Sequence, residues 1–262
     1  MNLGLGGKVA WVLGASSGLG RASALSLARE GASVAVSSRR LEPLEETASS
    51  IAEETGSRCI AIPLDVSDGA ALDAAATEVA RELGAVDVLV ANAGGPPPGA
   101  FDAFGDDDLY DAFTLTTASA WRLTKSVLPA MKEKGRGCLL FITSSSTKEV
   151  IPGLLFSNMM RAAVVGMAKT LSKELGGDGI RVLCVAPGRI KTPRVDSRDE
   201  FEARATETSL DKVRAASEAR IALGRYGRTE EFGDVVAFLA SDRASYMTGT
   251  SVVVDGGMLN SL

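Results

Sequence analysis

Short apolar runs alternate with segments of helical hydrophobic period along the whole chain. Strands that are apolar on both faces are typical of a sheet covered by helices on both sides. The alternation therefore predicts an α/β fold with one doubly wound, mainly parallel seven-stranded sheet and helices on both faces. The predicted strands are residues 8–13, 33–37, 59–64, 86–91, 138–143, 181–186 and 251–254.

Neither an internal repeat nor a linker divides the sequence, so we interpret residues 1–262 as one domain. Its one long insertion without a strand, residues 191–223, is charged and helix-prone. The insertion lies between the sixth strand and the last helix, next to the sheet edge where doubly wound folds bind ligands. We expect a small helical lid over the substrate there, and surface decoration is the alternative.

A glycine-rich turn follows the first predicted strand, in the sequence V-A-W-V-L-G-A-S-S-G-L-G of residues 9–20. Gly14, Gly18 and Gly20 let the backbone bend and let a pyrophosphate approach, and the free N–H groups of the next helix face the anion. Their spacing, G-x-x-x-G-x-G, differs from the common dinucleotide pattern G-x-G-x-x-G. Taken alone, the turn fits either a dinucleotide site or a turn without a ligand.

Charge and composition exclude several classes of protein. The net charge is −5 and no block of lysine or arginine occurs, which argues against a nucleic-acid partner. The chain has no histidine, so a histidine base, a zinc site with histidine ligands and a Ser-His-Asp triad are excluded. We expect no metal site.

The cysteines and the hydropathy pattern bear on the compartment. Cys59, Cys138 and Cys184 lie far apart in apolar runs, which predicts buried thiols in a reducing compartment. No apolar run reaches the roughly 18 residues that span a bilayer, and the first eight residues lack the apolar core of a signal peptide. We therefore expect a cytoplasmic protein without a membrane partner.

Six motifs, in order and spacing, resemble those of the classical short-chain dehydrogenase/reductase family over nearly the whole chain. They are Gly14-Ala15-Ser16-Ser17-Gly18-Leu19-Gly20, Asp65-Val66, Asn92-Ala93-Gly94, Ser144, Pro187-Gly188-Arg189-Ile190-Lys191-Thr192 and Asp255-Gly256-Gly257. The resemblance implies a single Rossmann-type domain and a nicotinamide cofactor. It also implies a homo-oligomer, usually a tetramer and possibly a dimer, in which helices around Trp121 and Val164 pair between subunits.

The resemblance also implies a role for each motif in cofactor binding. Asp65 and Val66 would lie near the adenine, and Asn92, Ala93 and Gly94 would shape the wall of the site. The segment with Pro187, Gly188, Ile190 and Thr192 would wrap the nicotinamide end. The phosphate-binding turn would use Gly14, Ser16, Ser17, Gly18, Leu19 and Gly20.

The end of the second predicted strand bears on the choice of cofactor. A carboxylate there would accept hydrogen bonds from the ribose of NAD, whereas a guanidinium pairs with the 2′-phosphate of NADP. This chain has Ser38, where NAD-dependent relatives carry an acid, followed by Arg39 and Arg40. NADP(H) is therefore favoured over NAD(H). The alternative is that the two arginines are a solvated pair at the start of a helix near Leu41.

The catalytic positions depart from the family pattern. Members use an Asn-Ser-Tyr-Lys tetrad, with tyrosine and lysine four residues apart and the serine about thirteen residues before the tyrosine. Counting from Ser144 places Ser157 at the tyrosine and Arg161 at the lysine, and Thr116 falls at the asparagine. A serine hydroxyl is far more basic as its alkoxide than a phenol with a pKa of about 10, and an arginine does not give up its proton. The tetrad retains only its serine.

A divergent branch of the family, described as similar to 3-oxoacyl-carrier-protein reductases, is resembled by three groups of residues: residues 92–99, Ser144 with Lys148 and Glu149, and Ser157 and Asn158 with Arg161. In that branch Lys148 is the replacement candidate for proton donor, because burial lowers the pKa of a lysine readily. A solvated Lys148–Glu149 pair on a loop is the other interpretation. Two functions follow: an NADP(H)-dependent oxidoreductase acting on a small ketone or secondary alcohol, or an NADP(H)-binding protein that acts as a sensor or oligomer partner.

Overall fold

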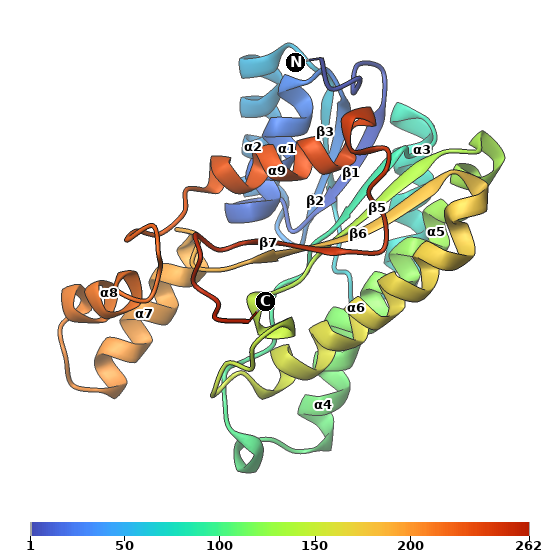
Figure 1. Cartoon of the computed structure of the whole chain (residues 1–262). Helices are drawn as coiled ribbons and strands as arrows, with labels where there is room; N and C mark the ends of the chain where they lie inside the picture. The colour runs from blue at the N-terminus through green and yellow to red at the C-terminus, as the bar shows by residue number, and fades with distance from the viewer. Residues whose placement is uncertain (1, 262) are drawn as a thin grey trace.

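The computed structural model describes residues 2–261, so both end residues of the predicted domain lie outside the described part. Seven parallel strands form one sheet in the order β3-β2-β1-β4-β5-β6-β7, which confirms the predicted doubly wound Rossmann-type fold (Figure 1). The strands are β1 (Val9–Leu13), β2 (Ser33–Ser38), β3 (Cys59–Pro63), β4 (Val88–Ala91), β5 (Gly137–Ile142), β6 (Ile180–Pro187) and β7 (Ser251–Val254).

Helices cover both faces of the sheet. One face carries α1, α2 and α9, and the other carries α3, α5 and α6, while α7 and α8 project beyond the sheet (Figure 1). The helices are α1 (Gly18–Arg29), α2 (Leu41–Thr55), α3 (Gly69–Leu83), α4 (Asp106–Phe113), α5 (Ser119–Lys134), α6 (Leu155–Leu175), α7 (Pro193–Ala205), α8 (Leu210–Glu218) and α9 (Thr229–Ala240).

The alternation of side chains along β1 shows why both faces are apolar. Ala10 and Val12 pack in the cluster beneath α1 and α9, whereas Trp11 and Leu13 pack in the cluster beneath α3, α5 and α6. Successive residues of a strand point to opposite faces, so a strand buried on both sides must be apolar throughout. The indole of fully buried Trp11 donates a hydrogen bond of 2.9 Å to the hydroxyl of Ser37 on β2, which satisfies its polar atom.

The predicted insertion contains α7 and α8. Strand β4 begins at Val88 rather than at residue 86. The buried carboxylate of Asp87 instead accepts hydrogen bonds from the backbone N–H of Val9 and from the ammonium of Lys134. Among residues 2–261 no helix has the length and apolar content needed to cross a bilayer.

Candidate active site

The loops at the carboxyl ends of the strands bring the motifs together, beginning with the turn between β1 and α1. Gly14 and Gly18 adopt φ values of +60° and +56°, which side chains with a Cβ rarely adopt. A Cβ on Gly20 would overlap the carbonyl of Gly14, so the turn and the helix pack with no room between them. These three glycines are therefore required by the local backbone.

Neighbouring loops hold this turn in place. The N–H of Ala15 donates to the carbonyl of Ser37 at 3.1 Å, and the amide of Asn92 donates to the carbonyl of Gly14 at 3.4 Å. Within the described residues, the side chain of Ser17 does not cap α1, and the first turn of α1 has no acidic residue. A helix N-terminus with free donors and no competing carboxylate fits a pyrophosphate. Ser16 and Leu19 lie in the same turn, and Ala93 and Gly94 follow Asn92 in the loop after β4.

The loop after β2 presents two basic side chains next to this turn. Arg39 and Arg40 are exposed, and α2 begins at Leu41, as predicted. The Ser38 hydroxyl donates to the carbonyl of Arg40 at 3.4 Å. Among residues 2–261 neither guanidinium forms an ion pair, so both are available to an anion. Asp65, after β3, accepts a hydrogen bond from the N–H of Ser67 at 2.9 Å, and Val66 is partly buried.

The segment after β6 closes the other side of the site. The N–H of Gly188 donates to the carbonyl of Val254 at 2.9 Å, and Ile190 is buried. Pro187 ends β6, and the Thr192 hydroxyl caps α7 by accepting from the N–H of Val195 at 3.3 Å. The methyl group of Thr192 lies against Gly18, so α7 begins beside the first turn of α1.

Ser144 and Arg161 both lie at the end of β5. The Ser144 hydroxyl accepts a hydrogen bond from the N–H of Ser146 at 3.1 Å, which leaves its own proton free to donate. A guanidinium N–H of Arg161 donates to the carbonyl of Ile142, two residues before Ser144, at 2.7 Å. Burial, and secondarily the charge of Arg194, lowers the pKa of Arg161 to about 10. Ser157 precedes Arg161 by one helical turn, so the two residues share a face of α6.

Thr116 and Lys148 form no hydrogen bond with Ser144 or Arg161 among the described residues. Thr116 is 4% exposed, and its hydroxyl has no hydrogen-bond partner among the described residues. It lies in a π-helical segment, Thr114–Ala118, that joins α4 to α5. The Lys148 side chain is exposed, and no hydrogen bond in residues 2–261 links it to Ser144 or Arg161. The adjacent Glu149 accepts a hydrogen bond from the N–H of Asn260 at 3.2 Å, so the C-terminal segment reaches this loop.

Three contacts at the site are absent from the sequence-based prediction. Arg194 on α7 donates to the carbonyls of Gly95 and Pro96, at 3.3 and 3.4 Å, across the site. The Asn158 amide donates to the carbonyl of Ile151 at 3.0 Å and ties the loop before α6 to that helix. Each contact depends on the orientation of a loop or helix, and the sequence carries no periodic signal for it.

The third of these contacts anchors the insertion. The fully buried carboxylate of Asp199 on α7 accepts from the Arg189 guanidinium at 2.6 Å and from the Tyr226 hydroxyl at 2.9 Å. The guanidinium of Arg189 also lies 5.9 Å from the centre of the Tyr226 ring. The charges of Arg189 and Asp199 compensate each other, so the base of α7 is fixed to the loop after β6.

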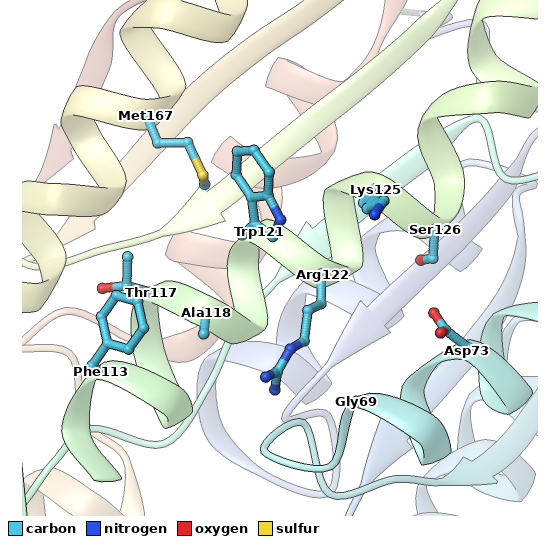
Figure 2. Close-up of a pocket in the computed structure, with 10 residues that line it drawn as sticks. All are labelled: Gly69, Asp73, Phe113, Thr117, Ala118, Trp121, Arg122, Lys125, Ser126 and Met167. Carbon is cyan, nitrogen blue, oxygen red and sulfur yellow. The ribbon is translucent and has the colours of Figure 1, made fainter. Parts of the chain in front are cut away.

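A cavity of about 940 Å³ lies elsewhere, between α3 and α5, as Figure 2 shows. None of the residues predicted to bind cofactor or substrate lines it. Its side chains include Phe113, Arg122, Met167 and Trp121, whose side chain is 58% exposed. This cavity is separate from the candidate active site.

The fold and the glycine-rich turn define a Rossmann-type dinucleotide-binding domain, and comparison with known proteins gives the family. The family model described as enoyl-(acyl carrier protein) reductase matches residues 14–259. The chain belongs to the short-chain dehydrogenase/reductase family of oxidoreductases.

Individual relatives cover almost the full chain. The 3-oxoacyl-(acyl-carrier-protein) reductase FabG of Thermotoga maritima is 34% identical over 255 residues, which are 97% of this chain and 99% of that protein. The oxidoreductase UcpA of Escherichia coli K12 is 34% identical over 254 residues, 97% of this chain and 95% of that protein. Among solved structures, L-sorbose reductase from Gluconobacter frateurii, complexed with NADPH and L-sorbose, has a TM-score of 0.95 at 31% identity, with both chains fully covered.

Proposed function

We propose that this protein is an NADP(H)-dependent oxidoreductase that interconverts a ketone and a secondary alcohol through an atypical active site. The observation that carries the proposal is that Ser144 follows β5 and Arg161 donates to the last carbonyl of β5, at the same sheet edge as the phosphate-binding turn. The L-sorbose reductase neighbour was solved with NADPH, and the FabG relative is a 3-oxoacyl reductase, which supports the same reaction class.

The chain has groups suited to each part of the cofactor. When bound, NADPH supplies the hydride that reduces a carbonyl carbon. The turn from Gly14 to Gly20 holds the pyrophosphate with backbone N–H groups, and Arg39 pairs with the 2′-phosphate. The segment from Pro187 to Thr192 covers the nicotinamide end. This assignment rests on the fit of the turn, because side chains at its glycines would crowd Asn92, Thr192 or the backbone of the turn itself.

The proton of the reaction needs a source other than a tyrosine. Reduction adds one hydride to the carbonyl carbon and one proton to the oxygen, and the cofactor leaves oxidised. Ser144 donates a hydrogen bond to the carbonyl oxygen, and Arg161 stabilises the negative charge that develops there. We assign the proton to Lys148, the lysine on the loop that joins β5 to α6 and follows Ser144. In the reverse direction, oxidation of the alcohol, Lys148 accepts the proton.

The test is carbonyl-dependent oxidation of NADPH, followed at 340 nm over a panel of small ketones and oxo acids. The Ser144→Ala variant should lose activity by about 100-fold or more while its affinity for NADPH stays unchanged, since the serine acts on the carbonyl and not on the cofactor. Lys148→Met should lose activity in the same way. Turnover that survives both substitutions would contradict the assigned roles.

Three polar positions favour a second candidate function, an NADP(H)-binding protein without turnover that acts as a sensor or oligomer partner. Thr116 is buried with an unpaired hydroxyl, and Ser157 and Arg161 occupy the positions of the family tyrosine and lysine. The double variant Ser157→Tyr with Arg161→Lys restores a phenol and an ammonium four residues apart. A rise of about 100-fold from background in a folded, NADPH-binding double variant means that the substrate site is intact, and continued inactivity favours the binding protein.

We also propose that the protein is a cytoplasmic homo-oligomer, with α5 and α6 at the subunit contact. Trp121 on α5 is 58% exposed and Met159 on α6 is 46% exposed, so both helices present a large apolar side chain that a second subunit could cover. All three cysteines are free thiols, which fits a reducing compartment. Trp121→Glu should lower the mass measured by sedimentation velocity, and an unchanged oligomer would place the contact elsewhere.

A further inference from the structure

Two guanidinium groups at the carboxyl edge of the sheet have no carboxylate partner. Arg161 reaches this edge from α6 and binds the carbonyl of Ile142 with one N–H group. Arg194 reaches it from α7 and binds the carbonyls of Gly95 and Pro96 with long hydrogen bonds of 3.3 and 3.4 Å. Among the described residues neither arginine forms an ion pair. A guanidinium has five N–H donors, so both side chains keep donors free.

Arginines with structural roles in this protein are satisfied differently. Arg189 is paired with the buried carboxylate of Asp199. Arg181 donates to three carbonyls at the end of α9, those of Leu239, Ala240 and Ser241, at 2.7 to 3.1 Å. Among the described residues Arg161 and Arg194 have no ion pair, and they donate to one and to two carbonyls rather than to three. A purely structural role therefore does not account for their donors.

Burial and a like charge disfavour the charged form of Arg161. The pKa of Arg161 is lowered first by burial and then by the charge of Arg194, and burial lowers the pKa of Arg194 itself. Burial and the charges of Arg189 and Arg194 lower the pKa of Arg198, one turn further along α7, while Glu202 and Asp199 act in the opposite direction. The site is therefore electropositive around Arg161 and Arg194. An anion bound between the two guanidinium groups would relieve the repulsion between them.

Acidic residues on neighbouring segments are already engaged. Asp196 pairs with Arg214 at 2.7 Å, and Asp255 accepts from the N–H groups of Gly257 and Leu259. Glu149 accepts from the N–H of Asn260. None of these carboxylates forms an ion pair with Arg161 or Arg194 within residues 2–261. These neighbouring carboxylates therefore leave the free donors of Arg161 and Arg194 open to an anion from outside the chain.

We propose that the carbonyl substrate carries an oxyanion group, a carboxylate or a phosphate, that Arg161 and Arg194 bind together. The proposal rests on the function proposed above and names its substrate class. The planar N–H pairs of arginine match the paired oxygens of both groups. Because Arg161 is bound to Ile142, two residues before Ser144, the anion lies close to the carbonyl oxygen. This proximity favours 2-oxo and 3-oxo acids or ketose phosphates over extended anions.

The test measures binding to the protein loaded with NADP⁺, where no reduction takes place. Calorimetry compares matched pairs of ligands that differ in charge: 2-oxobutanoate and its methyl ester, acetoacetate and its methyl ester, and dihydroxyacetone phosphate and dihydroxyacetone. At least one anion should bind tenfold or more tightly than its neutral counterpart. The preferred pair distinguishes a carboxylate from a phosphate. Its affinity should fall with added salt because the contact is between charges.

Single substitutions then locate the contact. Arg194→Gln should weaken the preferred anion tenfold or more and leave the neutral counterpart within twofold. Arg161→Gln should weaken the preferred anion tenfold or more as well. Arg204→Gln is the matched control, since Arg204 is an exposed residue of the same helix α7 and lies outside the site. It should leave both ligands unchanged.

The outcomes separate this inference from the proposed function. Failure of the protein to bind NADP⁺ or NADPH would refute the proposed function. If NADP⁺ binds normally but each charged ligand binds with the same affinity as its neutral counterpart, the anion site alone is refuted. The same holds if neither ligand of any pair binds measurably. Loss of NADP⁺ affinity in Arg194→Gln, without any change in the preference for an anion, would assign this arginine to the cofactor phosphates and also refute the inference.

Discussion

Replacing Arg39 tests how the protein chooses between NADPH and NADH. The exposed guanidinium of Arg39 follows β2, and no carboxylate in residues 2–261 competes for it. A hydrogen bond to a charged group contributes about 1.5–3 kcal/mol, and the 2′-phosphate is the one group that distinguishes the two cofactors. Arg39→Ala should therefore weaken NADPH binding roughly 10- to 150-fold and leave NADH binding unchanged. The difference between the cofactors should disappear.

The assay is quenching of intrinsic tryptophan fluorescence or calorimetry with each cofactor, at fixed salt because the contact is ionic. Arg40→Ala is the matched control, as a neighbouring exposed arginine at the N-cap of α2. A smaller loss in Arg40→Ala than in Arg39→Ala is expected. Equal affinities of the unmodified protein for NADPH and NADH would refute the reasoning before any variant is made.

Two further substitutions test contacts that the structure shows. Asp199→Asn leaves the guanidinium of Arg189 without its buried charged partner. The free energy of unfolding measured in urea should fall by about 3–5 kcal/mol, and hydrogen exchange in α7 should become faster. A fall of less than about 0.5 kcal/mol would mean that the pair is not structural. Hydrogen bonds from Arg225 and from the N–H of Arg228 lower the pKa of Glu231 to about 2, so its carboxylate stabilises the fold above its unfolded pKa of about 4.3. That contribution is lost as the pH falls through about 2, so the advantage of the unmodified protein over Glu231→Gln should disappear there, and an advantage that persists at lower pH would contradict this assignment.

The order and type of the elements could be predicted because the strands are buried on both faces. A strand such as β1, with Trp11 packed on one side and Val12 on the other, must be apolar throughout, and the sequence shows this directly. The π-helical segment between α4 and α5 could not be predicted. One extra residue in a helical turn barely changes the apolar period, so the sequence reads as continuous helix.

In the candidate site, too, some features could be predicted from the sequence and others could not. Gly14 and Gly18 could be recognised because a positive φ and close packing require glycine there. That Arg161 follows Ser157 by one turn of the same helix could be predicted by counting along the sequence. Arg194 could not be placed, since its contact with Gly95 depends on how α7 leaves the loop after β6. Long-range contacts of this kind leave no local pattern in the chain.

Isotope transfer distinguishes an oxidoreductase from a protein that only binds the cofactor. NADPH carrying deuterium at the transferable position is incubated with the protein and each small oxo acid, and the product alcohol is analysed by mass spectrometry. We predict an alcohol that is heavier by one deuterium, formed by the unmodified protein and strongly reduced in Ser144→Ala. Tight binding of NADPH without any labelled alcohol from any acceptor would contradict the account and leave a cofactor-binding protein in its place.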